Sequence, residues 1–354
     1  TANTPGAIRP CIYCYICVSK IFINQPMMCA VNHSMGREHE GDIIARSTDS
    51  RSMLVVGGGP GGMEAARLLA ARGHRVSLWE QDRDLGGTAR IAGLAYEPNE
   101  RLVHYLAGAV KSLPVDLQLG KTATAESIAR ENPDEVILAT GALRIAPDFP
   151  GKEQRHEFDG EELRGVLFGT SAAAAAKLNP WQRLMLQAAR ASQMLRIIKL
   201  LRFMSKIWMP IADEVVVIGG GLVGLELAEY LVERGRKVTV LEPGPALGPE
   251  LAIVRRARVL HLLREHGVKI SRGCQIEQIT ADAVIYTHKD EQKSVHARQV
   301  IIAIGAEPDA SLEQQLATVG VRVHRIGDCR EKSFIDGAIL DARRLVQQLE
   351  APVP

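Results

Sequence analysis

The sequence has few aromatic residues, little net charge and no long apolar run. Only 4% of its 354 residues are Phe, Trp or Tyr, whereas 32 are Gly, which indicates many tight turns and close backbone contacts. The net charge of +2 gives no reason to expect a nucleic-acid partner. Because no uncharged apolar stretch of about 18 residues occurs, we expect no membrane-spanning helix. Membrane contact is not the favoured expectation.

A secretory signal pattern is also missing before the first cysteines, which predicts a cytoplasmic protein with reduced thiols. Four of the six cysteines are Cys11, Cys14, Cys17 and Cys29, and in a reducing compartment such a cluster indicates metal rather than disulfides. Three thiols at successive i+3 positions with a distant fourth favour a [4Fe–4S] cluster. Zinc ribbons use two separated C-x-x-C pairs. Structural zinc and thiols without metal stay open as alternatives.

Two segments of the chain, residues 53–80 and 215–242, share one pattern. Each has an apolar β-branched run, a G-x-G-x-x-G, an apolar helical pattern, a second short strand and a Glu. The glycines are Gly57, Gly59 and Gly62 in the first segment and Gly219, Gly221 and Gly224 in the second. Glu80 and Glu242 each lie 23 positions after the first glycine. The pattern predicts strand–helix–strand units, and therefore an α/β fold with two doubly wound dinucleotide-binding domains.

Each residue type in this pattern has a physical role at a dinucleotide site. The first glycine permits the turn, the second lets the backbone approach a pyrophosphate, and the third lets the helix pack closely on the strand. The acidic residue can accept both ribose hydroxyls of an adenosine. At Glu242 a carboxylate would repel a 2′-phosphate, which favours NADH over NADPH, although Arg234 and Arg236 lie close in sequence. The alternative is a pair of glycine-rich turns in an ordinary α/β fold.

With two such units, the chain resembles the two-domain flavoprotein reductases, in which FAD occupies the first site and a nicotinamide the second. The segments LGG (85–87), EVILATGA (135–142) and HRIGDC (324–329) are similar to further flavin-contacting motifs of that family. The resemblance implies FAD binding by Gly57, Gly59, Pro60, Gly62, Glu80, Gly86, Gly87, Thr140, Gly141, Gly327 and Asp328. It implies NAD binding by Gly219, Gly221, Gly224 and Glu242, and places Glu226 near the nicotinamide as a candidate catalytic residue.

The same resemblance implies a division of the chain into three parts. Residues 1–46 would form the iron–sulfur segment. Residues 47–150 and 304–354 would form a discontinuous FAD-binding domain. Residues 151–303 would form the NAD-binding domain, with a helical insertion at 171–211. Neither nucleotide domain contains a C-x-x-C, and we expect the isolated Cys274 and Cys329 to be a core residue and a neighbour of Asp328. Electrons leaving the flavin would therefore exit through the N-terminal cysteines.

The cysteine segment itself resembles the linker of the trimethylamine dehydrogenase and 2,4-dienoyl-CoA reductase family. The matching pattern is R-P-C-x-x-C-x-x-C-x11-C, followed by Asn32 and G-R-E at 36–38. In that family an FMN-bearing (β/α)8 barrel of the Old Yellow Enzyme type comes first, and here it is absent. We expect the chain to be a subunit with a separate barrel partner, in a hetero-oligomer, rather than a fragment. His33 replaces the family's Pro and is expected to be a loop residue or a cluster neighbour.

The insertion between the two nucleotide units has its own pattern. Asn179–Pro180 predicts a helix start and Pro210 a stop. Arg196, Lys199, Arg202 and Lys206 fall on one arc of the predicted helix, with Leu195, Ile198, Leu201 and Trp208 on the remainder. Three interpretations stay open: a helix lying on its own domain, a docking element for a partner chain, and a basic amphipathic helix at a membrane surface.

Together these features predict an NADH-dependent flavin and iron–sulfur oxidoreductase. Electrons would pass from NADH to FAD, to the [4Fe–4S] cluster, and to the FMN of a partner barrel that reduces an activated C=C bond. In one alternative, electrons pass in the opposite direction, from a barrel to an external carrier, as in the amine dehydrogenases. The Cys spacing supports this alternative. A second alternative is a non-enzymatic redox-sensing or assembly subunit.

Overall fold

The computed structural model describes residues 6, 8–40, 43–152, 154–168, 171–191 and 197–350. The chain folds into two compact units. Unit 1 comprises Thr1–Gly93, Glu97–Leu143 and Ala306–Pro354, and unit 2 comprises Leu94–Tyr96 and Arg144–Gly305. Each unit contains a five-stranded sheet of parallel strands. The expected α/β class with parallel sheets is therefore confirmed.

The sheet of unit 1 has the order β15-β4-β1-β2-β3. Its strands are β1 (Ser52–Val56), β2 (Arg75–Glu80), β3 (Val115–Leu119), β4 (Glu135–Leu138) and β15 (Arg322–Arg325). The central strand β1 is apolar on both faces, as strands covered on both sides are. Met53 and Val55 pack on one face with α2 (Pro60–Ala71), α4 (Glu97–Lys111) and α13 (Phe334–Glu350). Leu54 and Val56 pack on the other face, near α5 (Ala125–Glu131) and α12 (Ser311–Leu316).

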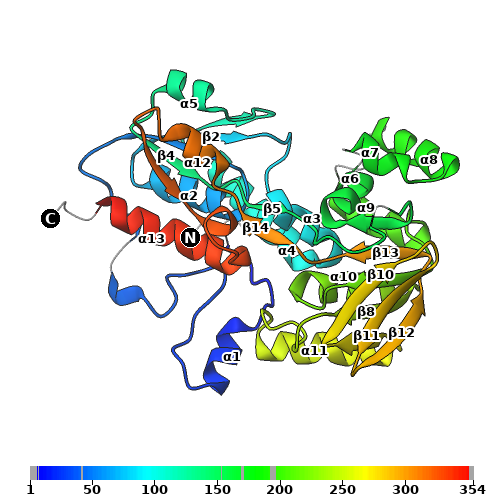
Figure 1. Cartoon of the computed structure of the whole chain (residues 1–354). Helices are drawn as coiled ribbons and strands as arrows, with labels where there is room; N and C mark the ends of the chain where they lie inside the picture. The colour runs from blue at the N-terminus through cyan, green and yellow to red at the C-terminus, as the bar shows by residue number, and fades with distance from the viewer. Residues whose placement is uncertain are drawn as a thin grey trace. The chain divides into compact units, whose positions relative to one another are not determined.

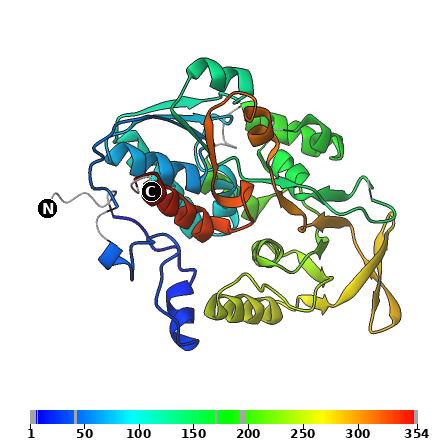
Figure 2. The same cartoon turned by 60° about the vertical axis from the view of Figure 1, so that its left-hand side comes forward.

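Helices α2 and α13 lie against each other over this sheet, as both Figure 1 and Figure 2 show. The N-terminal segment of unit 1 packs onto the same layer, because Ile12, Ala30 and Val31 are buried in its core. The remaining elements of this part of the chain are short. They are α1 (Ile16–Phe22), η2 (Glu38–Glu40), α3 (Gly87–Ala95), η4 (Gly327–Cys329) and the strands β5 (Ala142–Arg144) and β14 (Ala306–Pro308).

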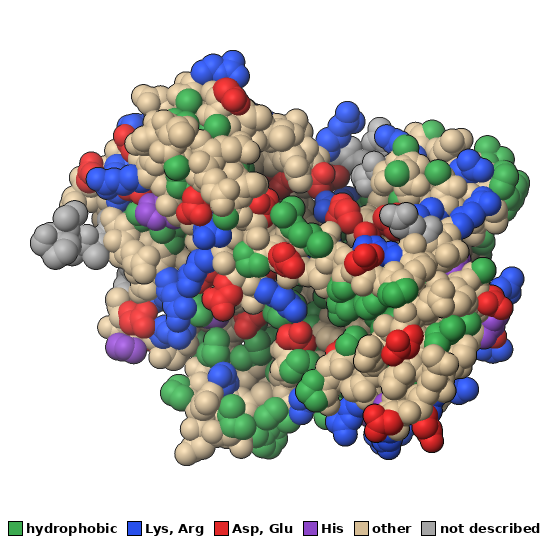
Figure 3. Space-filling view, in the orientation of Figure 1, with side chains coloured by type: hydrophobic (Ala, Val, Ile, Leu, Met, Phe, Trp, Pro, Cys, Tyr) green, Lys and Arg blue, Asp and Glu red, His purple; other side chains and the backbone are tan. Residues whose placement is uncertain are grey.

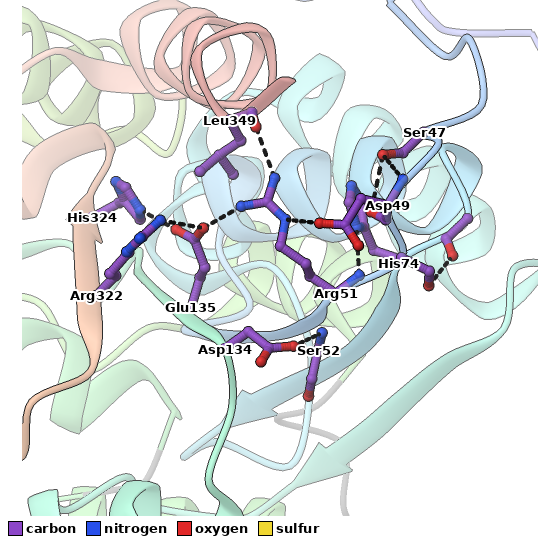
Figure 4. Close-up of polar contacts among 12 residues, drawn as sticks. Ser47, Asp49, Arg51, Ser52, His74, Asp134, Glu135, Arg322, His324 and Leu349 are labelled. Carbon is purple, nitrogen blue, oxygen red and sulfur yellow. Dashed lines mark hydrogen bonds and ion pairs between the residues drawn. The ribbon is translucent and has the colours of Figure 1, made fainter. Parts of the chain in front are cut away.

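Charged side chains tie the amino-terminal ends of the unit 1 strands together (Figure 4). Glu135, only 2% exposed at the start of β4, pairs with Arg51 before β1 and with His324 of β15. Arg51 also donates to the Leu349 carbonyl of α13 at 2.7 Å. This network lies at the strand ends opposite to the fingerprint loops and therefore serves stability rather than cofactor binding.

The sheet of unit 2 has the order β6-β13-β7-β8-β9. Its strands are β6 (Glu157–Asp159), β7 (Glu214–Ile218), β8 (Lys237–Glu242), β9 (Lys269–Arg272) and β13 (Gln299–Ile302). Val215 and Val217 pack on one face, in a core shared with α6 (Gly160–Phe168), α10 (Leu222–Val232) and α11 (Ile253–Glu265). Val216 and Ile218 pack on the other face against an antiparallel sheet. That sheet consists of β10 (Cys274–Ile279), β11 (Ala283–His288) and β12 (Glu291–His296).

The insertion differs from the single helix that the sequence predicts. It contains α7 (Ala172–Ala176), α8 (Pro180–Ala191) and α9 (Ile198–Ile207). The predicted start is confirmed, because Asn179 and Gln182 exchange hydrogen bonds between side chain and backbone at 2.8 and 3.0 Å. Residues 192–196, with the predicted arc positions Leu195 and Arg196, lie outside the described residues. Among the described residues, no helix is long and apolar enough to span a membrane.

Candidate dinucleotide sites and cysteine segment

The first glycine-rich loop connects β1 to α2 in unit 1. Gly57 has a φ of +107°, and a side chain there would collide with the Ala139 carbonyl. A Cβ at Gly62 would collide with the Gly57 carbonyl, so that α2 packs closely only without it. Gly59, by contrast, faces open space, with nothing within 4 Å of an added Cβ. Two glycines thus serve the fold, and the middle one leaves the backbone accessible to a ligand.

Glu80 at the end of β2 presents its carboxylate to this loop. Its side chain accepts from the Gly58 amide at 2.6 Å and from the Asp82 amide at 2.8 Å. These two bonds orient the carboxylate, and a carboxylate has about four acceptor sites. The carboxylate is thereby oriented at the loop, where the ribose hydroxyls of a dinucleotide would approach it. With Pro60 at the first turn of α2, the loop fits the adenosine end of a dinucleotide.

The other predicted flavin residues come together at the carboxyl ends of the same strands. The Gly86 amide donates to the Gly58 carbonyl at 2.8 Å, and Gly87 lies against Gly59. Thr140, which follows β4, approaches Cys329 beside Asp328, and Gly141 is the next residue of the chain. The carboxyl edge of a parallel sheet is where such folds bind ligands.

Asp328 has a structural partner as well as a predicted cofactor. Its Oδ1 accepts from the Ser333 and Phe334 amides at 2.8 and 2.9 Å, at the start of α13. The neighbouring Gly327 has a φ of +66° and donates its amide to Asp341 at 3.0 Å. The turn is therefore held by α13, and one carboxylate oxygen of Asp328 is used for this purpose.

The two isolated cysteines are buried thiols. Cys329 donates to the carbonyls of Leu138 and Ile326 at 3.1 and 3.2 Å, and burial raises the pKa of its thiol. Cys274 donates to the Glu242 carbonyl at 3.3 Å, and burial raises its pKa as well. Reactive cysteines are exposed and have a lowered pKa. Both residues therefore behave as core side chains, in line with the sequence-based expectation.

The second glycine-rich loop, between β7 and α10, repeats the first. Gly219 has a φ of +113°, and an added Cβ would lie 2.6 Å from the Ile304 side chain. A Cβ at Gly224 would collide with the Gly219 carbonyl. The carboxylate of Glu242 accepts from the Gly220 and Gly244 amides. The predicted NAD residues of unit 2 thus share the arrangement of the FAD residues of unit 1.

One difference separates the two loops. A Cβ at Gly221 would lie 3.2 Å from the Glu250 carboxylate, whereas the equivalent Gly59 faces open space. Glu250 accepts from the Leu222 amide at the first turn of α10, at 3.2 Å. A carboxylate therefore lies where a pyrophosphate would approach the helix. The sequence analysis missed Glu250, because it is 28 residues from Leu222 and belongs to no fingerprint.

Glu226, the candidate catalytic residue, is held in an ion-pair group. Its carboxylate lies 3.5 Å from the guanidinium of Arg255, which pairs more closely with Glu229 at 2.7 Å. Burial raises the pKa of Glu226, and the attraction of Arg255 only partly opposes this. Arg255 also lies over the Tyr96 ring, 4.3 Å from its centroid. A nicotinamide-facing role for Glu226 stays a prediction. The pairing of Arg255 with Glu226 and Glu229 could not be found from the sequence.

The cysteines of the N-terminal segment lie on a strongly bent backbone. Tyr13 and Tyr15, which separate the first three cysteines, have left-handed φ values of +51° and +61°. The Tyr13 amide donates to the Cys11 sulfur at 3.3 Å. Burial raises the pKa of Cys14 to about 11, and the charges of Cys29 and Cys11 add to this effect. Three of the four thiols are therefore near enough to interact electrostatically.

These thiols do not form a closed ligand set. In the part of the chain that the structure describes, no three His, Cys, Asp or Glu side chains are placed to hold a metal ion. The donor chemistry still fits an iron–sulfur cluster, since thiolates are its ordinary ligands. The cluster stays a prediction that rests on donor type and spacing.

A buried charge group fixes the cysteine segment to α2. Arg9 donates to both carboxylate oxygens of Glu64, at 2.9 and 3.0 Å, and to the Val31 carbonyl. Arg67 pairs with the same carboxylate at 2.7 and 2.9 Å. His33 is 3% exposed, and its Nε2 lies 2.7 Å from the Asp336 carbonyl of α13. His33 is thus in a turn, as expected, but it is buried against α13 of unit 1.

Comparison with known proteins agrees with this geometry. Residues 51–330 match the family model described as pyridine nucleotide-disulphide oxidoreductase. A bilirubin reductase from Mediterraneibacter gnavus (strain CC55_001C) is 32% identical over 329 residues, covering 92% of this chain and 45% of that protein. An NADH oxidase from Thermoanaerobacter brockii is 32% identical over 343 residues, covering 95% of this chain and 46% of that protein.

A solved structure is also similar to this chain over nearly its whole length. The complex of a 2-naphthoyl-CoA reductase with 2-naphthoyl-CoA matches with a TM-score of 0.80 at 26% identity, covering 97% of this chain and 46% of that chain. The chain thus spans about half the length of the relatives it matches. The family model covers most of the chain, and the chain belongs to the pyridine nucleotide-disulphide oxidoreductase family.

Proposed function

We propose that the chain is the electron-input part of an NADH-dependent oxidoreductase whose substrate is reduced at a flavin barrel on a partner. The observation that carries this proposal is the presence of two complete fingerprints, one in each unit, with a thiol-rich segment built onto the first. The bilirubin and 2-naphthoyl-CoA reductases support an unsaturated substrate for the whole assembly, since both names denote reduction of conjugated compounds.

The residues of each unit have separate tasks. In unit 1, Glu80 and the backbone of Gly58 to Gly62 would hold the adenosine and pyrophosphate of FAD. In unit 2, Glu242 and the Gly219 to Gly224 loop would hold NADH. Cys11, Cys14, Cys17 and Cys29 would hold a [4Fe–4S] cluster after losing their protons. When bound, these groups supply hydride and single-electron transfer, so that the protein's own contribution is positioning.

Preference for NADH over NADPH follows from the surroundings of Glu242. Its carboxylate is fixed by two backbone amides and would repel a 2′-phosphate. Arg234, the cation that could offset this repulsion, is turned elsewhere. Its guanidinium lies 3.6 Å from the centre of the Tyr230 ring and donates to Ser205 at 2.8 Å. Arg236 donates to the Arg234 carbonyl at 3.3 Å.

The partner would meet the chain beside the cysteines. Ile21 and Phe22 on α1 are 62% and 70% exposed, and Ile23 and Met27 are 47% and 48% exposed. Hydrophobic side chains are also seen together over α1 in Figure 3. Exposed apolar groups of this kind mark interaction sites. We propose that an FMN-bearing (β/α)8 barrel covers them in a hetero-oligomer.

Anaerobic titration of the purified, FAD-loaded chain with NADH tests the proposal. We expect NADH, and not NADPH, to bleach the flavin absorbance. Gly224→Ala should abolish the bleaching while FAD stays bound, because the added Cβ collides with the Gly219 carbonyl. Gly160→Ala is the matched control in unit 2, since a Cβ there would meet only the Arg144 side chain, at 4.0 Å. A wild-type chain that holds FAD but is not bleached by NADH would contradict the proposal.

The Glu250 carboxylate at the start of α10 favours one other candidate, in which the second site does not take up NADH. The chain would then pass electrons from a barrel to an external carrier, as in the amine dehydrogenases. In that case NADH would leave the flavin oxidised in both wild type and Glu250→Gln. An anaerobic preparation without iron and acid-labile sulfide would exclude the cluster in either case.

A further inference from the structure

The insertion in unit 2 has a composition unlike the rest of the chain. Between residues 171 and 211 there are seven Lys or Arg residues and no Asp or Glu. Since the whole chain has a net charge of +2, the remainder carries −5. Two of the three tryptophans, Trp181 and Trp208, are also in this segment. Cationic and aromatic side chains are thus concentrated in a segment that has no acidic residue of its own, and Lys177 pairs with Glu162 of the preceding helix α6 at 2.6 Å.

Helix α8 turns an apolar face outward. Trp181, Leu184 and Met185, at positions i, i+3 and i+4, are 62%, 55% and 38% exposed. Residues with this spacing lie on one side of a helix. Only Leu186 of this helix is buried. Leu186 and Ala189 pack on the core of unit 2, so that α8 has a second apolar side, which is in contact with solvent.

Helix α9 repeats this arrangement with lysines added. Phe203 and Ile207 are 61% and 69% exposed, and Lys199 and Lys206 are exposed on the same side of the helix. Ile198 is the buried residue of this helix. Helices α8 and α9 thus lie on their own domain through Leu186 and Ile198, and a second apolar side that includes Phe203 and Ile207 is left in solvent. In Figure 3, hydrophobic side chains alternate with Lys and Arg side chains over α7 and α8.

We propose that α8 and α9 attach the protein to an anionic lipid surface, with Trp181, Leu184, Phe203 and Ile207 inserted among the lipids. Helices that lie in a membrane interface combine aromatic and aliphatic residues on one face with Lys and Arg beside them. Lysine stems can lie along the apolar region while their charges reach anionic headgroups. Arg190, Lys199 and Lys206 are exposed on these two helices, which contain no Asp or Glu, and charge of one sign fits a negative lipid surface better than a protein face with charges of both signs.

Cosedimentation of the full chain with vesicles tests this inference. We expect binding to phosphatidylcholine vesicles that contain phosphatidylglycerol, no binding to phosphatidylcholine alone, and weaker binding as salt is added. The double variants Trp181→Ala/Phe203→Ala and Lys199→Glu/Lys206→Glu should each lower the affinity about tenfold or more. Ile253→Ala/Lys269→Glu is the matched control, because it removes one exposed apolar residue and reverses one exposed cation elsewhere in unit 2.

Three results would overturn the inference. The first is that wild-type protein does not bind anionic vesicles, and the second is that it binds both vesicle types equally. The third is that the control variant and the α8 and α9 variants lose the same amount of vesicle affinity. Capture of a protein partner through Trp181 and Phe203, without vesicle binding, would replace the lipid by that partner. The reduction of FAD by NADH without vesicles should be the same in all variants. This measurement checks that the variants are folded, and it distinguishes failure of the inference from failure of the proposed function.

Discussion

Replacing Glu64 by Gln should weaken the attachment of the cysteine segment more than any surface change of similar size. Glu64 is 4% exposed and accepts four hydrogen bonds from Arg9 and Arg67. Arg9 directly precedes Pro10 and Cys11, and it also donates to the Val31 carbonyl just beyond Cys29. Through Arg9, the carboxylate of Glu64 thus holds both ends of the cysteine segment on α2.

The size of the effect follows from burial. The side chains of Arg9 and Arg67 are 16% and 18% exposed, so Glu64→Gln leaves two poorly solvated cations without their anion. Removing one partner of a buried ion pair costs about 3–5 kcal/mol. For a domain of about 150–250 residues, each kcal/mol lowers Tm by about 2–4 °C. We therefore expect the melting of unit 1 to fall by about 6–20 °C.

Glu97→Gln on α4 is the control for this measurement. Glu97 pairs with Arg101 at 2.7 Å in the same unit, but the two side chains are 39% and 53% exposed. Exposed pairs contribute about 0.2–1 kcal/mol, so the control should melt within a few degrees of wild type. Anaerobic Glu64→Gln protein should also show a lower ratio of iron to FAD, because the cysteine loop loses its anchor. A Tm like that of the control would refute the assigned role of Glu64.

The same carboxylate predicts a dependence on pH. Burial would raise the pKa of Glu64, but Arg67 and Arg9 outweigh it and hold the pKa below the ordinary value of 4.5. Because the pKa is lowered in the folded state, the contribution to stability is complete above the ordinary pKa and is lost as the pH falls through the folded-state value. The difference in Tm between wild type and Glu64→Gln should therefore shrink in acid. A difference that stays constant below pH 4.5 would contradict this assignment.

Four further substitutions, in three experiments, test the rest of the molecule. Glu250→Gln should tighten NADH binding about three- to tenfold and reduce its salt dependence, because a negative charge is removed from the pyrophosphate position. NADH binding is measured by fluorescence titration. Weaker binding by the variant would show that the carboxylate favours NADH binding instead. Gly59→Ala should fold normally without FAD but bind FAD poorly. Gly62→Ala should lower the Tm of the FAD-free chain, because only the Cβ at position 62 collides with the protein. Equal Tm values for the two FAD-free variants would contradict this. Glu135→Gln should destabilise unit 1 by about 3–5 kcal/mol without changing FAD reduction by NADH, because the Arg51–Glu135–His324 network lies at the opposite end of the sheet.

The parts of the fold that could be predicted from sequence are those with local causes. The turn after β1 requires a left-handed residue at Gly57, and α2 requires the absence of a side chain at Gly62; both requirements are visible within six residues. The same holds for β7 and α10. Apolar β-branched runs followed by such turns sufficed to predict both parallel sheets.

The parts that could not be predicted depend on contacts between distant segments. Glu250 reaches Leu222 across 28 residues, and Arg9 reaches Glu64 across 55. Neither pair has a spacing that periodicity or a motif would reveal. The outward faces of α8 and α9 also depend on where the helices lie, because an amphipathic pattern does not state which face is buried. For the four cysteines, spacing indicates the donor type, whereas their relative positions in space do not follow from spacing.

Helix α2 connects the nucleotide chemistry of unit 1 with the cysteine segment. Its first turn contains Gly62, which closes the dinucleotide loop, and Glu64 follows two residues later. At about 1.5 Å of rise per residue, the two positions are about 3 Å apart along the helix axis. A rigid element of this length fixes the cysteine segment relative to the first glycine-rich loop without any flexible connection. The charge group at Glu64 is therefore a positioning device as well as a source of stability, since its loss would change where the thiols lie before it changed whether FAD binds.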